Sequence, residues 1–197
     1  IDLTINKGEI VSIVGASGAG KSTLLHILGT LDNADSGILT IDGIEVTQLR
    51  DKKIAQFRNQ KIGFVFQAHH LLPEFTALEN IMMPALIGGS SKSDATQKAK
   101  ALLNQLGLSD REEHRPSELS GGEQQRVAVA RALINSPAVV FADEPSGNLD
   151  SASAKSLHQL FFDLRKSMNQ TFVIVTHNNE LADMADRKLT IKDGVCV

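Results

Sequence analysis

The chain has 197 residues, of which 42% are hydrophobic and 22% charged, and its formal net charge is -3. This composition is that of an ordinary globular protein, long enough to bury a core. The small negative charge argues against a protein that works mainly on nucleic acid, because such proteins carry a strongly basic surface. The single cysteine, Cys196, excludes an internal disulfide framework, and no apolar run has the length needed to span a bilayer.

Short β-branched apolar runs alternate with segments of helical periodicity along the chain. The expected strands, in chain order, are 10–14, 38–41, 44–46, 62–66, 138–142, 172–176 and the two arms of a hairpin over 188–197. The expected helices are one after the glycine-rich turn at 15–20, a helical stretch over 76–107, one that starts at a capping box over 120–123 and stops before Pro137, one over 154–164 and a short one over 180–185.

Strands that alternate with helices predict an α/β fold with a mostly parallel sheet, and the two hairpins predict an antiparallel β part. No strand is expected between about 71 and 135, so we expect a helical lobe there, inserted into a single domain that spans 1–197. The sequence starts at Ile1 in the middle of a pattern, and we expect a short N-terminal stretch to precede it.

The segment from Gly15 to Ser22 fits the pattern G-x-x-x-x-G-K-[ST] between a strand and a helix. Glycines let backbone N–H groups converge on phosphate oxygens, and the helix N-terminus adds the positive end of its dipole. Lys21 would reach the β- and γ-phosphates, and the Ser22 hydroxyl would bind Mg2+. The expected nucleotide-binding residues are Gly15, Ala16, Ser17, Gly18, Ala19, Gly20, Lys21, Ser22 and Thr23.

Two acids follow the apolar run 139–142, at the end of a strand where open α/β sheets place their ligands. Asp143 is typical of the acid that holds magnesium in phosphate-loop enzymes, and Glu144 suits a general base for an attacking water. A pair of acids after a strand is by itself more often a solvated turn. The phosphate loop upstream makes the functional interpretation the preferred one.

The segment Leu119-Ser120-Gly121-Gly122-Glu123-Gln124-Gln125 resembles the signature motif of the ABC ATPases. Three further segments agree with this family in order and placement: Gln67 at the end of a strand resembles its Q-loop, 146–150 resembles its D-loop, and His177 resembles its switch histidine. The resemblance covers essentially the whole chain. It implies the P-loop NTPase core of the ABC ATPases and an ATP hydrolase coupled to transport.

The resemblance also implies a homodimer that sandwiches two ATP molecules, with Mg2+, between head-to-tail subunits. One subunit would supply the phosphate loop, the catalytic residues Lys21, Gln67, Glu144 and His177, and the magnesium ligands Ser22, Gln67 and Asp143. The other subunit would bind the same nucleotide in trans through Ser120, Gly121, Gly122 and Glu123, with the D-loop residue Asp150 acting across the interface. A monomer should therefore hydrolyse ATP poorly.

Segment 142–150 resembles one group within the family, and within that group segments 67–80 and 114–119 are most similar to the lipoprotein-releasing members. Macrolide or peptide exporters and cell-division ATPases belong to the same group and remain alternatives. Two membrane permease subunits would dock near Gln67–Phe75, placing the chain at the cytoplasmic face of the inner membrane as a peripheral subunit. The alternative for the apolar residues of this segment is that they form helical-lobe core; His69 and His70 lack the flanking ligands of a metal site.

Two departures from the family pattern stand out. The aromatic residue that usually stacks on adenine is not found, since the chain has no Tyr or Trp, and we expect it in the preceding stretch. Asn178 follows His177 where the family commonly has an acid. Non-transport ABC ATPases remain a distant alternative, and a small GTPase is disfavoured because no N-K-x-D motif is present.

Overall fold

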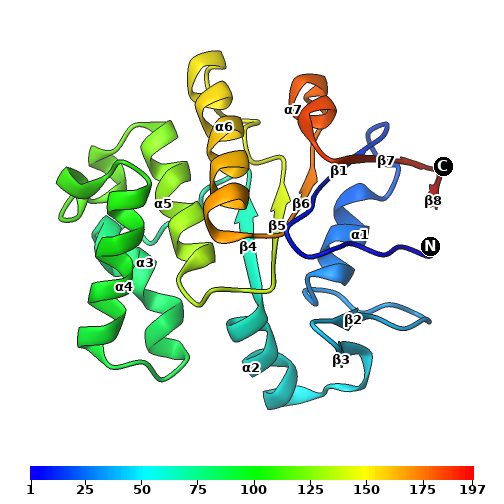
Figure 1. The fold of residues 1–197 in the computed structure, drawn as a ribbon, viewed down its shortest axis with the longest axis horizontal. Helices are drawn as coiled ribbons and strands as arrows, with labels where there is room; N and C mark the ends of the chain where they lie inside the picture. The colour runs from blue at the N-terminus through cyan, green and yellow to red at the C-terminus, as the bar shows by residue number, and fades with distance from the viewer.

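The computed structural model describes residues 1–197 and folds into a sheet flanked by helices (Figure 1). The strands are β1 (Ile10–Val14), β2 (Thr40–Ile41), β3 (Ile44–Glu45), β4 (Ile62–Phe66), β5 (Val139–Asp143), β6 (Phe172–Val175), β7 (Arg187–Lys192) and β8 (Val195–Cys196). The α-helices are α1 (Lys21–Leu28), α2 (Asp51–Lys61), α3 (Ala77–Ile87), α4 (Lys92–Gln105), α5 (Gly121–Leu133), α6 (Ser151–Met168) and α7 (Asn179–Met184). Three 3-10 turns complete the chain: η1 (Val46–Gln48), η2 (Ser109–Arg111) and η3 (Pro116–Glu118).

Six strands form the main sheet in the order β4-β5-β6-β1-β7-β8, and β2 and β3 form a separate hairpin. All pairs from β4 to β7 are parallel, and only β7–β8 is antiparallel. The expected mostly parallel sheet with an antiparallel part is therefore confirmed. Because the parallel strands end at the same edge, the loops that follow β1, β4, β5 and β6 gather there.

Successive residues of the central strands face two different cores, as the two-residue period of a strand requires. Val140 and Ala142 of β5 pack with the helices α3 to α7, whereas Val139 and Phe141 pack with α1, α2 and the β2–β3 region. Both faces of the sheet are covered, which explains why β5 and β6 read as continuous apolar runs rather than alternating ones.

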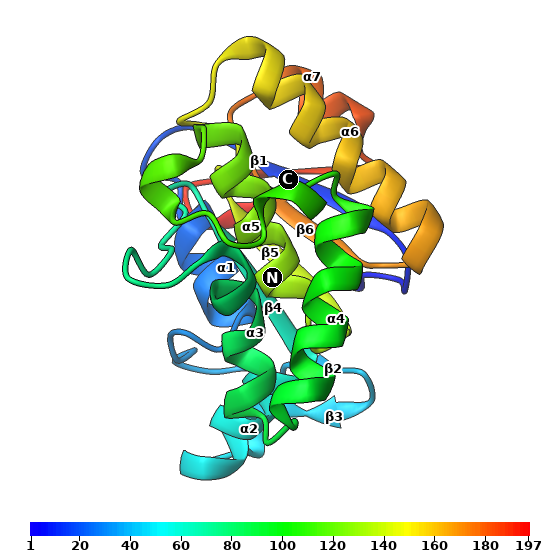
Figure 2. The ribbon, with the colours of Figure 1, turned by 90° about the vertical axis from the view of Figure 1, so that its left-hand side faces the viewer.

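Between β4 and β5 the regular structure is all helical, with α3, α4 and α5 gathered beside β4 at one end of the molecule (Figure 1). Figure 2 shows these three helices side by side, seen from that end. Their shared core contains Ile81, Leu103 and Leu133, each at most 1% exposed. No strand interrupts residues 67–138, in line with the helical lobe expected there.

Two features differ from the expectations. Helix α2 was not expected, because the segment is strongly polar and buries only Phe57. Strand β7 does more than form a hairpin with β8: it joins the parallel sheet beside β1, with Val11 opposite Arg187. No helix in the structure combines the length and the apolar character needed to cross a membrane.

Candidate functional site

The glycine-rich loop joins β1 to α1 in a backbone shape that side chains would not allow. Gly15 and Gly20 have φ of 154° and 97°, and a Cβ at Gly15 would lie 2.2 Å from the backbone oxygen of Ile191. The Lys21 ammonium folds back over this loop and donates to the carbonyl oxygens of Gly15 and Ala16, at 3.0 and 2.9 Å. Lys21 thus holds a positive charge over the loop that the sequence predicts to hold phosphate.

Ser22 and Asp143 come together although 121 residues separate them. The Ser22 hydroxyl donates to Oδ1 of Asp143 at 3.1 Å, and Nε2 of His26 lies 3.8 Å from Oδ2. Burial raises the pKa of Asp143 above its usual value, and the hydrogen bond from Ser22 partly offsets that effect. A pocket of about 530 Å³ opens beside them, and Gln67 and Glu144 also line it.

Glu144 follows directly after β5 and has a positive φ of 45°, a conformation that costs a residue with a side chain about 1 kcal/mol or more. Its backbone N–H donates to the Val175 carbonyl at 2.9 Å, which ties it to the end of β6. Its side-chain Oε2 lies 2.8 Å from Nδ1 of His177 and accepts from the His177 backbone N–H at 3.2 Å. The two residues therefore form a pair between neighbouring strand ends, with His177 largely exposed.

Gln67, directly after β4, lies next to the loop that follows β5. Its side-chain Nε2 donates to Oδ1 of Asn148 at 2.9 Å, and Nδ2 of Asn148 donates to the Gln67 backbone oxygen at 3.2 Å. The fully buried Gln125 of α5 ties both loops to one helix, because its Nε2 donates to the carbonyls of Phe66 and Pro145 at 3.1 and 2.7 Å. The sequence alone assigned a role to Gln67, whereas Asn148 and Gln125 stood only as members of the D-loop and signature segments.

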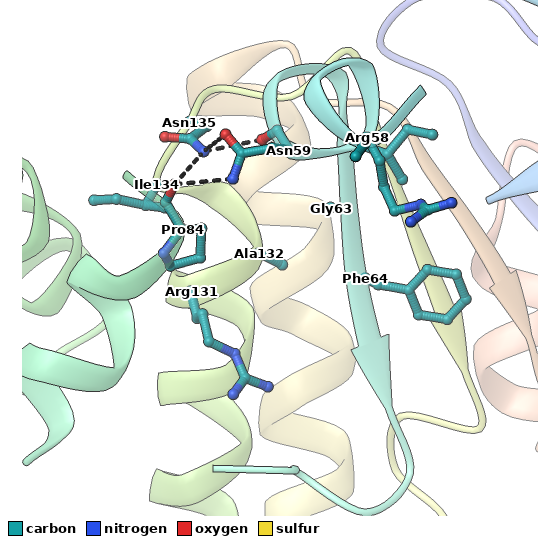
Figure 3. A pocket seen from close by; sticks show the side chains of 11 residues that line it. Arg58, Asn59, Gly63, Phe64, Pro84, Arg131, Ala132, Ile134 and Asn135 are labelled. Atoms are coloured by element: carbon teal, nitrogen blue, oxygen red, sulfur yellow. Dashed lines mark hydrogen bonds between the residues drawn. The ribbon is translucent and has the colours of Figure 1, made fainter. Parts of the chain in front are cut away.

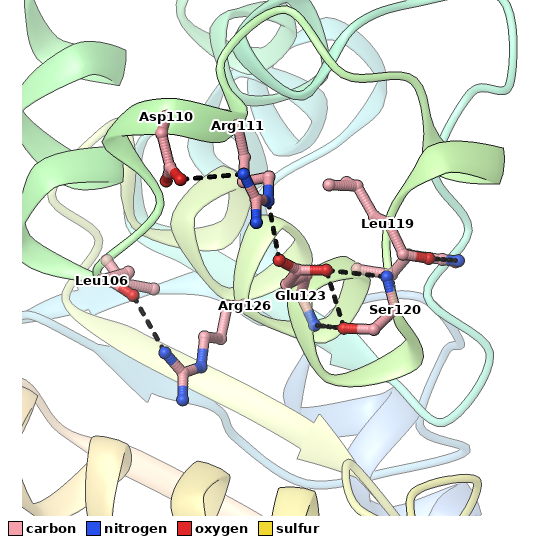
Figure 4. Close-up of polar contacts among 8 residues, drawn as sticks. Leu106, Asp110, Arg111, Leu119, Ser120, Glu123 and Arg126 are labelled. Carbon is pink, nitrogen blue, oxygen red and sulfur yellow. Dashed lines mark hydrogen bonds and ion pairs between the residues drawn. The ribbon is translucent and has the colours of Figure 1, made fainter.

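Ser120 and Glu123 form the predicted capping box at the start of α5 (Figure 4). Oε2 of Glu123 accepts from both the backbone N–H and the hydroxyl of Ser120, each at 2.8 Å. Arg111, from η2, donates to Oε1 of Glu123 at 2.9 Å. These bonds lower the pKa of Glu123 to about 2, with the bond from the Ser120 backbone as the largest cause. Both carboxylate oxygens are thus engaged within one subunit.

The structure does not bring the signature residues to the phosphate loop of their own subunit. None of the four residues Ser120, Gly121, Gly122 and Glu123 lines the pocket beside Asp143. Instead, Gly121 and Gly122 lie against the start of α6, where added Cβ atoms would come within 3.5 Å of Leu149 and 3.2 Å of Ser153. The expected use of this motif by a second subunit is compatible with such a placement.

Asp150 caps helix α6. Its Oδ1 accepts from the backbone N–H groups of Ala152 and Ser153, both at 3.0 Å, and its Oδ2 accepts from the Ser153 hydroxyl at 2.6 Å. The Ser153 hydroxyl bond is the largest cause that lowers the pKa of Asp150. Within one subunit this carboxylate is therefore a helix cap, and its expected action across an interface stays a prediction.

A second pocket of about 280 Å³ lies between α2, β4, α3 and α5 (Figure 3). At one end Asn135 donates to the carbonyls of Asn59 and Pro84, at 2.9 and 3.2 Å. At the other end the Arg131 guanidinium donates to the carbonyls of His69 and His70. Burial lowers the pKa of Arg131. Arg131 thus joins this pocket to the segment that follows Gln67.

The chain has clear relatives among known proteins. Residues 1–147 match the family model described as "ABC transporter". The chain is 62% identical over 197 residues to the lipoprotein-releasing system ATP-binding protein LolD of Cytophaga hutchinsonii, covering 100% of this chain and 90% of that protein. It is 54% identical over 195 residues to the LolD of Shewanella frigidimarina, covering 99% and 82%.

Solved structures agree in fold. The chain superposes with a TM-score of 0.86 and 41% identity on a dimeric ATP-binding cassette in a post-hydrolysis state bound to ADP and Pi, covering 98% of this chain and 84% of that one. A dimeric bacterial ABC transporter cassette matches equally well, with a TM-score of 0.86 and 42% identity over the same shares. The chain therefore belongs to the ABC transporter family, as an ATP-binding cassette of the ATP-hydrolysing type.

Proposed function

We propose that this chain is the ATP-hydrolysing subunit of a transporter that releases lipoproteins from the inner membrane. The observation that carries the proposal is the identity of 62% along the whole chain to a lipoprotein-releasing ATP-binding protein. The match spans 100% of this chain and 90% of that relative, so it covers every segment on which the sequence analysis based its choice of subgroup. An ATPase subunit need not touch the cargo, so the cargo assignment rests on this likeness and on the membrane partner.

Nucleotide binding is assigned to the loop Gly15–Thr23. In the proposed binding step, phosphate oxygens replace the carbonyls of Gly15 and Ala16 as partners of the Lys21 ammonium. Backbone N–H groups at the start of α1 add the positive end of the helix dipole. Gly15 admits no side chain, because a Cβ there would meet the backbone oxygen of Ile191, whereas at Gly18 the space around a Cβ position is open.

The residues beside this loop fit a magnesium ion, since Mg2+ prefers oxygen ligands. Ser22 Oγ and Asp143 Oδ1 lie 3.1 Å apart, and the side-chain oxygen of Gln67 accepts no hydrogen bond from another residue. We assign Ser22, Asp143 and Gln67 as the residues that would hold it. When bound, the ion would neutralise charge on the phosphate oxygens during transfer.

Glu144 is assigned as the general base that takes a proton from the attacking water. Its carboxylate lies at the pocket edge with Oε2 2.8 Å from His177 Nδ1, so His177 holds the carboxylate in place. Glu144 departs from the extended conformation of β5 through its strained φ of 45°, and its side chain lines the pocket. His177 is largely exposed and would be covered when a second subunit closes over the nucleotide.

The complete site is proposed to need two copies of this chain. Ser120, Gly121, Gly122 and Glu123 of one subunit would face the nucleotide held by the other, and Asp150 would lie at the same interface. Support comes from the dimeric solved cassettes of the same fold and from the separation of these residues from the phosphate loop in one subunit. ATP binding would close the pair, and hydrolysis with product release would open it.

Permease subunits are proposed to dock on the segment Gln67–Phe75 and the neighbouring pocket. Leu72 and Phe75 are 41% and 37% exposed, although both are apolar. The buried Asn80 holds their loop in shape, because its Nδ2 donates to the carbonyls of Leu72 and Phe75, both at 3.1 Å. A preformed apolar loop suits a protein partner, which would keep the ATPase at the cytoplasmic face of the inner membrane.

The decisive experiment is capture of the membrane partner. The full-length protein with Glu144→Gln, which should hold ATP without turnover, is expressed in its host and purified from detergent-solubilised membranes. We expect two permease subunits and lipoproteins to copurify, and we expect Phe75→Asp in the same background to lose them while the exposed control Val195→Asp keeps them. Copurification of an exporter or cell-division permease instead would leave the ATPase in place but overturn the lipoprotein assignment.

A further inference from the structure

Asn148 is the one side chain that makes two hydrogen bonds to Gln67, one to its backbone and one to its side chain. We propose that Asn148 is a positioning residue: its amide fixes which way round the Gln67 amide lies, and so presents the Gln67 side-chain oxygen to the magnesium site. The inference rests on the proposed role of Gln67 as a metal ligand and adds the residue that orients it.

The orientation follows from which groups can donate. The backbone oxygen of Gln67 only accepts, so the corner of the Asn148 amide that faces it, at 3.2 Å, has to be the NH2 group. The other corner of Asn148 is then its oxygen, which only accepts. The Gln67 side chain, 2.9 Å from that oxygen, must therefore turn its own NH2 group toward Asn148. Reversing either amide would place two donors or two acceptors against each other.

In this orientation the side-chain oxygen of Gln67 is left without a hydrogen-bond partner. It accepts no hydrogen bond from any residue of the chain, and Gln67 lines the same pocket as Ser22 and Asp143. A metal ion needs the oxygen of an amide, not its nitrogen. The amide of an unrestrained glutamine rotates easily in solvent. A fixed hydrogen-bond acceptor beside its nitrogen therefore favours the orientation in which its oxygen faces the metal site.

The backbone segments that carry Gln67 and Asn148 are fixed relative to each other, so the two side chains are held within hydrogen-bonding distance. Phe66 pairs with Asp143 in the sheet, so Gln67 and the loop after β5 start from neighbouring positions. The buried Gln125 holds the carbonyls on both sides, at Phe66 and Pro145. Gly147 completes the fit, because a Cβ there would lie 2.8 Å from Nε2 of Gln67.

The test separates metal-dependent from metal-free nucleotide binding. Affinity for a fluorescent ATP analogue is measured with Mg2+ and with EDTA, and the ratio of the two gives the gain from the metal. We expect Asn148→Ala to lower this gain by about three- to tenfold, the size of one or two net hydrogen bonds, with binding in EDTA unchanged. Gly147→Ala should act in the same direction, because its φ is not positive and the added methyl only crowds Gln67.

Three further variants make the outcome unambiguous. Asn104→Ala, an exposed asparagine on α4, serves as the control and should keep the full gain. Gln67→Ala should lose the gain, and adding Asn148→Ala to it should cost nothing more, because Asn148 acts through Gln67. If Gln67→Ala loses the gain but Asn148→Ala keeps it, the inference is overturned while the proposed metal role of Gln67 stands. If Gln67→Ala keeps the gain, the metal role of Gln67 is itself wrong, and the inference goes with it.

Discussion

The two regions to which we assign the nucleotide chemistry differ in how far one subunit completes them. At the edge of the sheet, Ser22 comes from α1, Asp143 and Glu144 from the end of β5, and His177 from the loop after β6, and they already contact one another in pairs. At the start of α5, Ser120 and Glu123 are three residues apart and satisfy each other, with Arg111 as their outside partner. The first region is assembled by the fold, and the second by local helix capping.

The difference explains why each region suits its proposed role. Side chains from several strand ends define an open pocket whose polar groups can exchange their protein partners for a ligand. A capping box instead forms a rigid helix end that keeps its shape without any ligand. A face built in that way can be presented to another subunit without prior ordering, which lowers the cost of association.

The largest expected effect comes from removing the proposed base, Glu144, in the pocket at the sheet edge. Glu144→Gln keeps the size of the side chain but cannot take a proton, so ATP turnover should fall by roughly 100-fold or more. Nucleotide affinity should change little, because Lys21 and Ser22 are untouched. Steady-state phosphate release and equilibrium binding measure the two quantities, with the exposed Glu180→Gln as the control. Loss of binding together with turnover would show that Glu144 belongs to the binding machinery instead.

The next effect tests the residue that links the two regions. Gln125 lies on the capped helix α5 and is fully buried. Its side chain donates hydrogen bonds to the carbonyls of Phe66 and Pro145, which flank the sheet-edge pocket. Gln125→Leu removes both donated bonds in the interior, and we expect a loss of about 2–3 kcal/mol in the free energy of unfolding. Denaturant unfolding checks the value against Gln159→Leu on the exposed face of α6, for which about 0.5 kcal/mol or less is expected. Equal losses in the two variants would deny Gln125 this linking role.

Most elements of the fold could be predicted from the sequence, because the apolar pattern reports burial directly. Strands β1, β4 and β6 are short apolar runs, and the bounds that the sequence predicts for them agree with the observed ones to within one residue. Helix α2 was missed for the same reason: it buries only Phe57, and its position depends on tertiary bonds such as those from Arg58 to Thr30. A pattern of burial carries no signal for an element that is held mainly by polar contacts.

The residues of the candidate site also fall into two groups: those that a contiguous motif identifies and those whose contacts depend on the fold. The glycine loop, the two acids and the signature segment are contiguous patterns, so their residues could be chosen from the sequence. The contacts that Asn148 and Gln125 make could not be predicted, although both residues lie in quoted segments, because their partners are distant in the chain: 81 residues for Asn148 and Gln67, 59 and 20 for Gln125 with Phe66 and Pro145. Asn148 reaches Gln67 only because β4 and β5 are neighbours in the sheet, although more than 70 residues separate them. Strand order is a property of the fold that no local spacing reveals.

A smaller effect tests the self-supporting character of the capped region. Glu123→Ala removes one half of the capping box and the ion pair with Arg111, and we expect it to lower the free energy of unfolding by about 1 kcal/mol. Because the folded pKa of Glu123 is about 2, against 4.5 for an unperturbed glutamate, its stabilisation is complete above pH 4.5 and is lost as pH falls toward 2. Acid unfolding should therefore shift to higher pH in Glu123→Ala, and the exposed Glu113→Ala should leave the acid midpoint in place.

The smallest expected effect concerns His158, whose Nε2 lies 3.0 Å from the Ser146 hydroxyl in the loop after β5. Its Nδ1 is buried without a partner, and burial lowers the pKa of the imidazole below its usual 6.5. The unfolded chain then binds the proton more readily, so stability that is present above pH 6.5 is lost as pH falls.

His158→Gln replaces the titrating ring with an amide that can still reach Ser146. The free energy of unfolding, measured between pH 7 and 5.5, should fall less steeply in this variant, by up to about 1 kcal/mol per pH unit. Some slope should remain, because burial also lowers the pKa of His69 beside Gln67. An unchanged slope would mean that His158 binds the same fraction of a proton in the folded and unfolded chains over this range, so that its burial does not lower its pKa.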